Sequence, residues 1–188
     1  MSSTTLLGIT TDPVPQILRL TSMYNASWFA PVVFNYFGTT YFGSNYIYDT
    51  PEIFGPDGTL WRLAHDPSIP LEDSVALLCA LDMPVIEWEH LSPICTQLMK
   101  FHWKITMGPK GLIQTSPRTH IMALIAAMES VKVALTELEK PLLGFSIHQT
   151  SVTDNFWEWI DPITEQAITY DMAIGEKHAP VWHSASNR

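Results

Sequence analysis

The segment from Ser116 to Lys140 constrains the fold most, because its start, its buried side and its end can all be read from the residues. Ser116 is a favourable N-cap, and Pro117 suits the first helical position, where its missing N–H would have no partner in the helix. Pro141 then ends the pattern. At 1.5 Å per residue, a helix over 117–140 is about 36 Å long, enough to cross a small domain. Apolar residues at steps of three and four form one stripe along it: Ile121, Leu124, Ile125, Met128, Val131, Leu135 and Leu138.

Shorter patterns of two kinds occupy the rest of the chain. Caps, prolines and helical spacing of apolar residues predict three helices, over residues 13–24, 71–81 and 93–104. Aromatic and β-branched density between turn residues predicts extended structure, with strands within 26–48, a hairpin over 53–63, a strand at 145–148 and a strand pair within 156–172.

Together these elements predict an α+β fold, in which a long central helix packs with shorter helices and antiparallel strands or hairpins. A chain of 188 residues is most simply a single domain. We expect residues 1–11 to be a short leader anchored only by a few apolar side chains. Residues 175–188 are expected to form a polar C-terminal tail.

Charged residues are scarce in this chain. It has 10 basic and 19 acidic residues, 29 in all, whereas a soluble domain of this length typically carries about 47. We therefore expect part of the surface to face other subunits, although a neutral surface rich in Ser and Thr on a monomer is the alternative. The net charge of -9 and the scattered Lys and Arg argue against nucleic-acid binding. No run of 18 apolar residues and no signal-peptide pattern occurs, so neither a membrane partner nor export is expected.

The span 26–48 is aromatic and contains no charged residue. Tyrosine packs its ring while keeping its hydroxyl in water, which makes such residues common at protein interfaces. We expect these side chains to contact neighbouring subunits, with an internal core or a stacking platform for bases or sugars as alternatives. The interface candidates are Trp28, Phe29, Phe34, Tyr36, Phe37, Tyr41, Phe42, Tyr46 and Tyr48.

Cys79 and Cys95 both lie in apolar, helical contexts, so we expect two buried thiols from a reducing compartment. The sequence contains no phosphate-binding glycine motif and no paired Cys-x-x-Cys. No nucleotide cofactor and no structural zinc is therefore expected.

Two patterns resemble metal sites. Glu87-Trp88-Glu89-His90 contains one Glu-x-x-His step, but a di-iron bundle needs two such steps and two more glutamates. Pro84 and Pro93 also leave little room for a helix there. His178 and His183 could chelate an ion, yet a polar tail with two histidines is usually just solvated. We assign no metal ligand from the sequence.

Two further patterns raise the alternative of an enzyme. Gly144-Phe145-Ser146-Ile147-His148 resembles a nucleophile elbow with His148 or His120 as base, but it lacks the second glycine and the strand–turn–helix context. Glu158, Asp161 and Glu165 could act on glycosides, with Trp157 and Trp159 as sugar platforms. A half-buried strand produces the same alternation, and we favour that reading. No catalytic residue is assigned.

Two hypotheses of function remain, from different classes. We favour a structural subunit of a large multi-subunit assembly, which binds copies of itself and other structural subunits. Within that class we expect a virion component of a tailed phage (capsid, neck, tail or baseplate). If the protein is not part of a virion, we expect it in the cytoplasm. The alternative is a small soluble hydrolase that uses Ser146 with a histidine, or carboxylates near Glu158.

Overall fold

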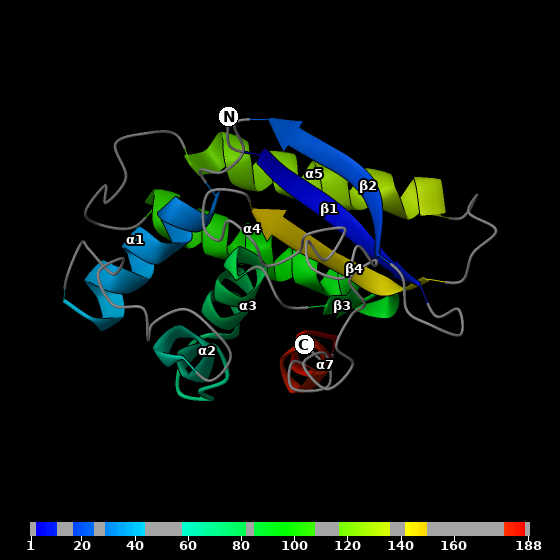
Figure 1. Ribbon diagram of the computed structural model, residues 1–188. Helices are drawn as coiled ribbons and strands as arrows, with labels where there is room; N and C mark the ends of the chain where they lie inside the picture. The colour runs from blue at the N-terminus through cyan, green and yellow to red at the C-terminus, as the bar shows by residue number, and fades with distance from the viewer. Residues whose placement is uncertain are drawn as a thin grey trace, which may run out of the picture.

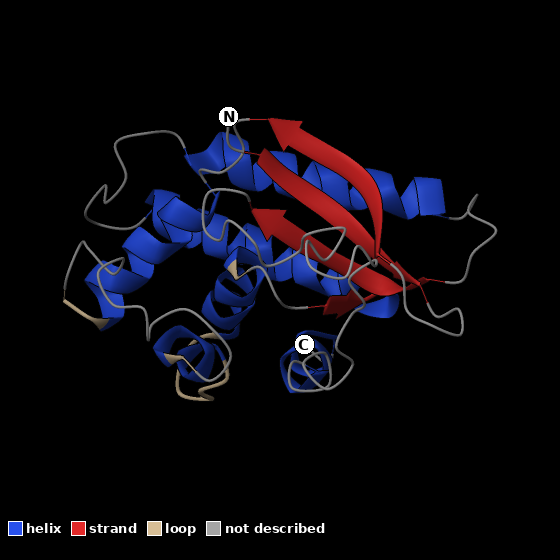
Figure 2. Ribbon diagram, viewed as in Figure 1, coloured by secondary structure: helices blue, strands red, loops and turns tan. Residues whose placement is uncertain are grey.

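The computed structural model has an α+β fold, as predicted, with one antiparallel sheet and a group of helices (Figures 1 and 2). Two long helices lie behind the sheet in the view of Figure 1, and the shorter helices pack against them and against one another. The structure describes residues 3–10, 17–24, 29–43, 58–81, 85–107, 117–135, 142–149 and 179–186. Within these ranges, no helix is both long enough and apolar enough to cross a lipid bilayer.

The sheet has the strand order β2-β1-β4-β3, with all neighbours antiparallel. Its strands are β1 (Ser3–Thr10), β2 (Ile17–Tyr24), β3 (Val85–Glu87) and β4 (Leu142–Gln149). The first strand lies inside the sheet, so the leader predicted over residues 1–11 is wrong. Leu6, Leu7 and Ile9 are fully buried, because the hydrogen-bond ladders on both edges of β1 hold this short apolar run in the core.

The helix predicted over residues 13–24 is also wrong, because Ile17–Tyr24 forms strand β2. Eight residues are too few for apolar spacing alone to separate a helix from a strand. Pairing with β1 decides the outcome here. The register shifts between Leu6 and Leu7, and Leu20 of β2 packs against the hydrophobic core.

Helix α5 (Pro117–Leu135) confirms the long helix, within the residues that the structure describes. Five residues of the predicted stripe are buried in one hydrophobic cluster: Ile121, Leu124, Ile125, Met128 and Val131. Helix α4 (Leu91–Met107) packs against α5 and confirms the helix predicted over 93–104, and α3 (Leu71–Ala80) confirms the one over 71–81. The last predicted residues of the long helix, 136–140, lie outside the described ranges.

Helix α1 (Phe29–Tyr41) replaces the strands predicted within 26–48. The prediction relied on the β propensity of aromatic and β-branched residues, which is a weak preference that packing overrides. Apolar side chains lie almost all round this helix, as expected for a helix buried in a core. Its buried members include Phe29, Val33, Phe34 and Phe37.

Two short helices correct further predictions. Helix α2 (Thr59–Ala64) lies where the second strand of a hairpin over 53–63 was expected, because Leu60, Trp61 and Ala64 bury one helical face. Helix α7 (Ala179–Ser186) lies within the predicted polar tail. Val181 and Ala185 are four residues apart and both are buried, and the helix packs against α3 and α4.

Strand β4 confirms the extended structure predicted at 145–148, whereas the strand pair predicted within 156–172 lies outside the described residues. Strands β3 and β4 approach closely at Gly144. A Cβ atom there would lie 2.3 Å from the carbonyl oxygen of Ile86 and 3.0 Å from the Cα atom of Glu87. Only glycine therefore allows this pairing without a shift of β3.

We expect Gly144→Ala to lower the free energy of unfolding by at least about 2 kcal/mol, since the new methyl group meets backbone that cannot rotate away. Gly43→Ala is the matched control. Gly43 has a φ of 65° but open space around its Cβ position. Alanine there should therefore cost only the strain of a left-handed backbone, about 1 to 2 kcal/mol. Urea unfolding measures both variants. A loss below about 1 kcal/mol for Gly144→Ala would show that β3 shifts at little cost.

Candidate functional site

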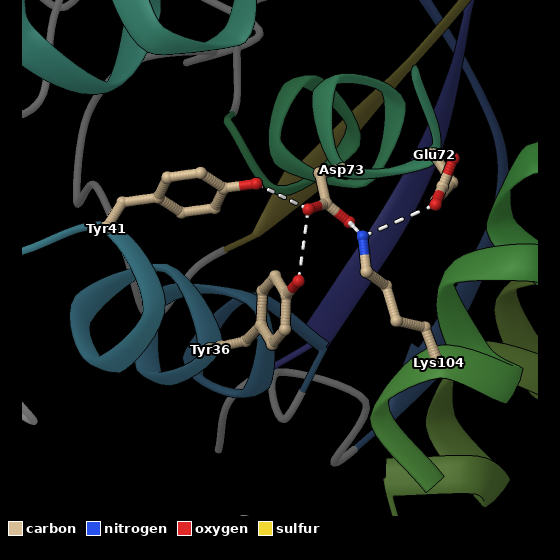
Figure 3. A network of polar contacts seen from close by, with 5 residues as sticks. All are labelled: Tyr36, Tyr41, Glu72, Asp73 and Lys104. Carbon is tan, nitrogen blue, oxygen red and sulfur yellow. Dashed lines mark hydrogen bonds and ion pairs between the residues drawn. The ribbon is translucent and has the colours of Figure 1, made fainter. Parts of the chain in front are cut away.

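The most connected polar group of the described chain surrounds Asp73, whose side chain is fully buried (Figure 3). The hydroxyls of Tyr36 and Tyr41 both donate to Asp73 Oδ2, at 3.0 and 2.6 Å. Lys104 Nζ donates to Asp73 Oδ1 at 2.8 Å and lies 3.3 Å from Glu72 Oε1. We call these five residues the Asp73 network.

Three helices supply the Asp73 network. Both tyrosines come from α1, the two carboxylates come from the first turn of α3, and the lysine comes from the last turn of α4. A carboxylate in the first turn of a helix also interacts favourably with the helix dipole. The network therefore ties α1, α3 and α4 together at one point.

Aromatic contacts hold the two phenols in place. The ring of Tyr36 meets the ring of Phe101 edge to face, with centroids 5.1 Å apart, and Phe37 stacks on Tyr41 at 5.1 Å. Lys104 Nζ lies 5.9 Å from the centroid of the Tyr36 ring, within the range of a cation–π contact. The hydroxyl groups are thus aimed at Asp73 by rings that are themselves packed.

The electrostatics keep every donor of the Asp73 network protonated. Burial, followed by the charge of Asp73, raises the pKa of Tyr36, and burial with the hydrogen bond to Asp73 raises the pKa of Tyr41. Burial alone would lower the pKa of Lys104, but the hydrogen bond and charge of Asp73 outweigh it, so this pKa is raised. A nucleophile or general base needs the opposite shifts. The arrangement suits a structural role better than a catalytic one.

The structure corrects the interface prediction for most of the aromatic residues that it describes. Phe29, Phe34 and Phe37 are fully buried within one chain, so their side chains cannot reach another subunit. Tyr36 is buried and Tyr41 is half-buried in the Asp73 network. Phe42 is exposed at the end of this run. The remaining candidates, Trp28, Tyr46 and Tyr48, lie outside the described residues.

Ser146 is fully buried in the middle of β4. In the sheet it pairs with Leu7 of β1 and Val85 of β3, which places the three residues in one row on the face opposite Phe145 and Ile147. An antiparallel strand of this kind lacks the strand–turn–helix of a nucleophile elbow. Of the proposed bases, His148 follows on β4 and His120 lies in the first turns of α5.

The other residues of the hydrolase hypothesis, Trp157, Glu158, Trp159, Asp161 and Glu165, lie outside the described residues, as does His178. His183 belongs to α7. Both cysteines are buried, as predicted, and burial raises the pKa of the Cys79 thiol, so the thiolate needed for nucleophilic chemistry is disfavoured.

A second polar cluster joins Glu87, Glu89 and His90. Glu87 ends strand β3, and His90 ends the one-turn 3-10 helix η2 (Trp88–His90) that leads into α4. His90 Nε2 lies 3.4 Å from Glu87 Oε2 and 3.6 Å from Glu89 Oε1. The sequence showed the Glu-x-x-His step, which puts both side chains on one face of an α-helix, whereas here Glu87 ends a strand and His90 lies in a 3-10 turn.

The Asp73 network could not be recognised in the sequence, because each of its residues looks like a common feature of an ordinary helix. Asp73 resembles any acidic residue in the first turn of a helix, and no spacing relates it to Lys104, which follows 31 residues later. The only available signal is the pair of tyrosines in an otherwise apolar segment.

Comparison with known proteins adds no relative: no family model, no curated protein and no solved structure matches this chain.

We expect Asp73→Ala to lower the free energy of unfolding by about 3 kcal/mol, because it leaves two phenols and an ammonium without their shared acceptor. Lys104 is one-third exposed, so water compensates part of its loss. The neighbouring Glu72→Ala is the matched control, with an expected cost below about 1 kcal/mol since Glu72 is partly solvated. Urea unfolding compares them, and equal effects would contradict the central role of Asp73.

The Asp73 network also predicts a loss of stability in alkali. Tyr36, Tyr41 and Lys104 have a raised pKa in the folded chain, against ordinary values of 10.0 for Tyr and 10.5 for Lys. The unfolded chain therefore loses these protons at lower pH than the folded chain does. The three side chains thus contribute fully to the free energy of unfolding below about pH 10, and this contribution declines as the pH rises further. In the double variant Tyr36→Phe and Tyr41→Phe, unfolding measured between pH 9 and 11 should show a flatter decline. An unchanged slope would show that other groups cause it.

Proposed function

We propose that this protein is a structural subunit of a large multi-subunit assembly and that the outer face of α4 is one of its contact surfaces. The observation that carries the proposal is the pair Trp103 and Met107, whose side chains are 52% and 73% exposed. They lie four residues apart and therefore side by side on the helix. Tryptophan is the residue most enriched at the energetic centre of protein interfaces.

The charge distribution on α4 favours a partner with an acidic surface. Helix α4 contains no carboxylate from Leu91 to Met107, and Lys100 on its exposed side adds a positive charge. The whole chain carries a net charge of -9. An apolar pair beside a lysine is complementary to an acidic surface, such as another face of a second copy or of a neighbouring structural subunit.

The contact surface is also held rigidly. Lys104, next to Trp103 in the chain, is bound to the buried Asp73 carboxylate, and Phe101 packs against Tyr36. These contacts fix the rotation of α4 about its axis. Since the exposed pair is already oriented in the free subunit, association would lose less conformational entropy.

The scarcity of charge across the sequence supports the same class of function, because a subunit that turns part of its surface to neighbours needs fewer ionised side chains. Within this class we favour a virion component of a tailed phage, at the capsid, neck, tail or baseplate. That choice reflects how common small structural subunits are in such particles, and it rests on no single residue.

Sedimentation velocity over a range of protein concentrations tests the proposal. The unmodified chain should form larger species as the concentration rises, and Trp103→Glu with Met107→Glu should weaken this self-association by at least about 30-fold, which corresponds to the loss of one interface hot spot. Asn35→Glu with Ser130→Glu is the control, since it adds the same charge at exposed polar positions that lie outside α4.

An unmodified chain that sediments as a monomer at every concentration would contradict contact between copies. Equal weakening in both double variants would instead assign the effect to added charge and would reject the apolar pair as the contact.

A further inference from the structure

We propose that Glu87, Glu89 and His90 form a binding site for a divalent transition-metal ion of the Zn²⁺ type. One ligand atom from each of the three residues lies within 4.8 Å of the other two, and His90 Nε2 faces Glu87 Oε2 and Glu89 Oε1. Imidazole nitrogen and carboxylate oxygen are ligands that zinc accepts in proteins. The two carboxylates would also balance the charge of the ion.

The distances fit a tetrahedral ion. Zinc binds nitrogen and oxygen at about 2.0 to 2.1 Å, so the edges of an ideal tetrahedron of ligands are about 3.3 to 3.4 Å long. The edges that start at His90 Nε2 measure 3.4 Å to Glu87 Oε2 and 3.6 Å to Glu89 Oε1. The two carboxylates lie within 4.8 Å of each other, so their side chains would close on an ion held by His90 Nε2.

The backbone fixes the two ligands that matter most. Glu87 is the last residue of β3 and pairs with Gly144 of β4, so its position is set by the sheet. The 3-10 turn of η2 then returns the chain so that His90, three residues later, lies on the same side. Glu87 Oε2 and His90 Nε2 lie 3.4 Å apart across this turn, close enough for a chelate.

His90 is oriented by a second contact. Its side chain is only 4% exposed, and Nδ1 lies 2.5 Å from the hydroxyl oxygen of Ser186 on α7. Histidines that bind metals usually use the other ring nitrogen in such a hydrogen bond, which fixes the ring and directs the free edge to the ion. Here the contact directs Nε2 toward the two carboxylates.

The carboxylates leave the site open to solvent. The side chains of Glu87 and Glu89 are 43% and 72% exposed, so an ion can arrive from water and keep a water molecule as its fourth ligand. The site lies just before α4 begins at Leu91, whereas the apolar pair of the assembly surface lies at its last turns. The two proposals are therefore independent.

A charged His90 between two carboxylates would give the same distances without any metal. Calorimetric titration of the full chain with ZnCl₂, after treatment with a chelator, separates the two explanations. The metal site predicts saturable binding of one Zn²⁺ that Glu89→Gln weakens at least about tenfold, and His90→Gln should abolish it. Glu129→Gln, an exposed position on α5, is the matched control and should bind as the unmodified chain does.

Thermal unfolding supplies a second readout. At free Zn²⁺ about 100-fold above the dissociation constant, the melting temperature of the unmodified chain should rise by about 5 to 10 °C, and that of Glu89→Gln should rise less. Glu89 is exposed, so this variant should fold even if His90→Gln does not. Absence of saturable binding, or binding that Glu89→Gln leaves unchanged, would overturn the proposal.

Discussion

The ion pair between Asp73 and Lys104 is the interaction on which the helical part of the structure depends. Removing a carboxylate from water costs several kcal/mol, and the cost is offset only when good partners replace the lost hydration. Asp73 has three such partners, the ammonium of Lys104 and the hydroxyls of Tyr36 and Tyr41. Because they come from two other helices, the need to satisfy one carboxylate fixes where α1 and α4 lie relative to α3.

This constraint explains why the aromatic run belongs to the interior. Tyr36 bonds Asp73 while its ring lies against Phe101, and the neighbouring apolar residues of α1 enter the same cluster as the stripe of α5. The scarcity of charge in the sequence therefore cannot be assigned to these aromatic side chains as subunit contacts. Among the described residues, Trp103 and Met107 on α4 are the most exposed large apolar side chains and fit it best.

Sequence patterns were reliable where one period continued over many turns. Helices α5, α4 and α3 run for 19, 17 and 10 residues, longer than the eight-residue strands β1 and β2, and they were predicted correctly. Short runs were misread, because β1 and β2 owe their extended form to each other and α1 owes its helix to the core around it. The Asp73 network was missed, and the Glu87–His90 pattern was set aside, because contacts distant in sequence build both. Asp73 and Lys104 are joined by packing, and the contact of His90 with Ser186 spans 96 residues.

Helix α4 contributes to the core, to the ion pair with Asp73 and to the exposed surface, and these requirements restrict its sequence. Its buried side must supply Ile94, Leu98 and Phe101 to the core, and its end must supply Lys104 to Asp73. Once that face is committed, the rotation of the helix leaves Trp103 and Met107 in water, at a cost that an isolated subunit could avoid with polar residues. Exposed apolar side chains fixed by a buried ion pair are consistent with a surface that a partner covers, which links the packing of the core to the proposed assembly.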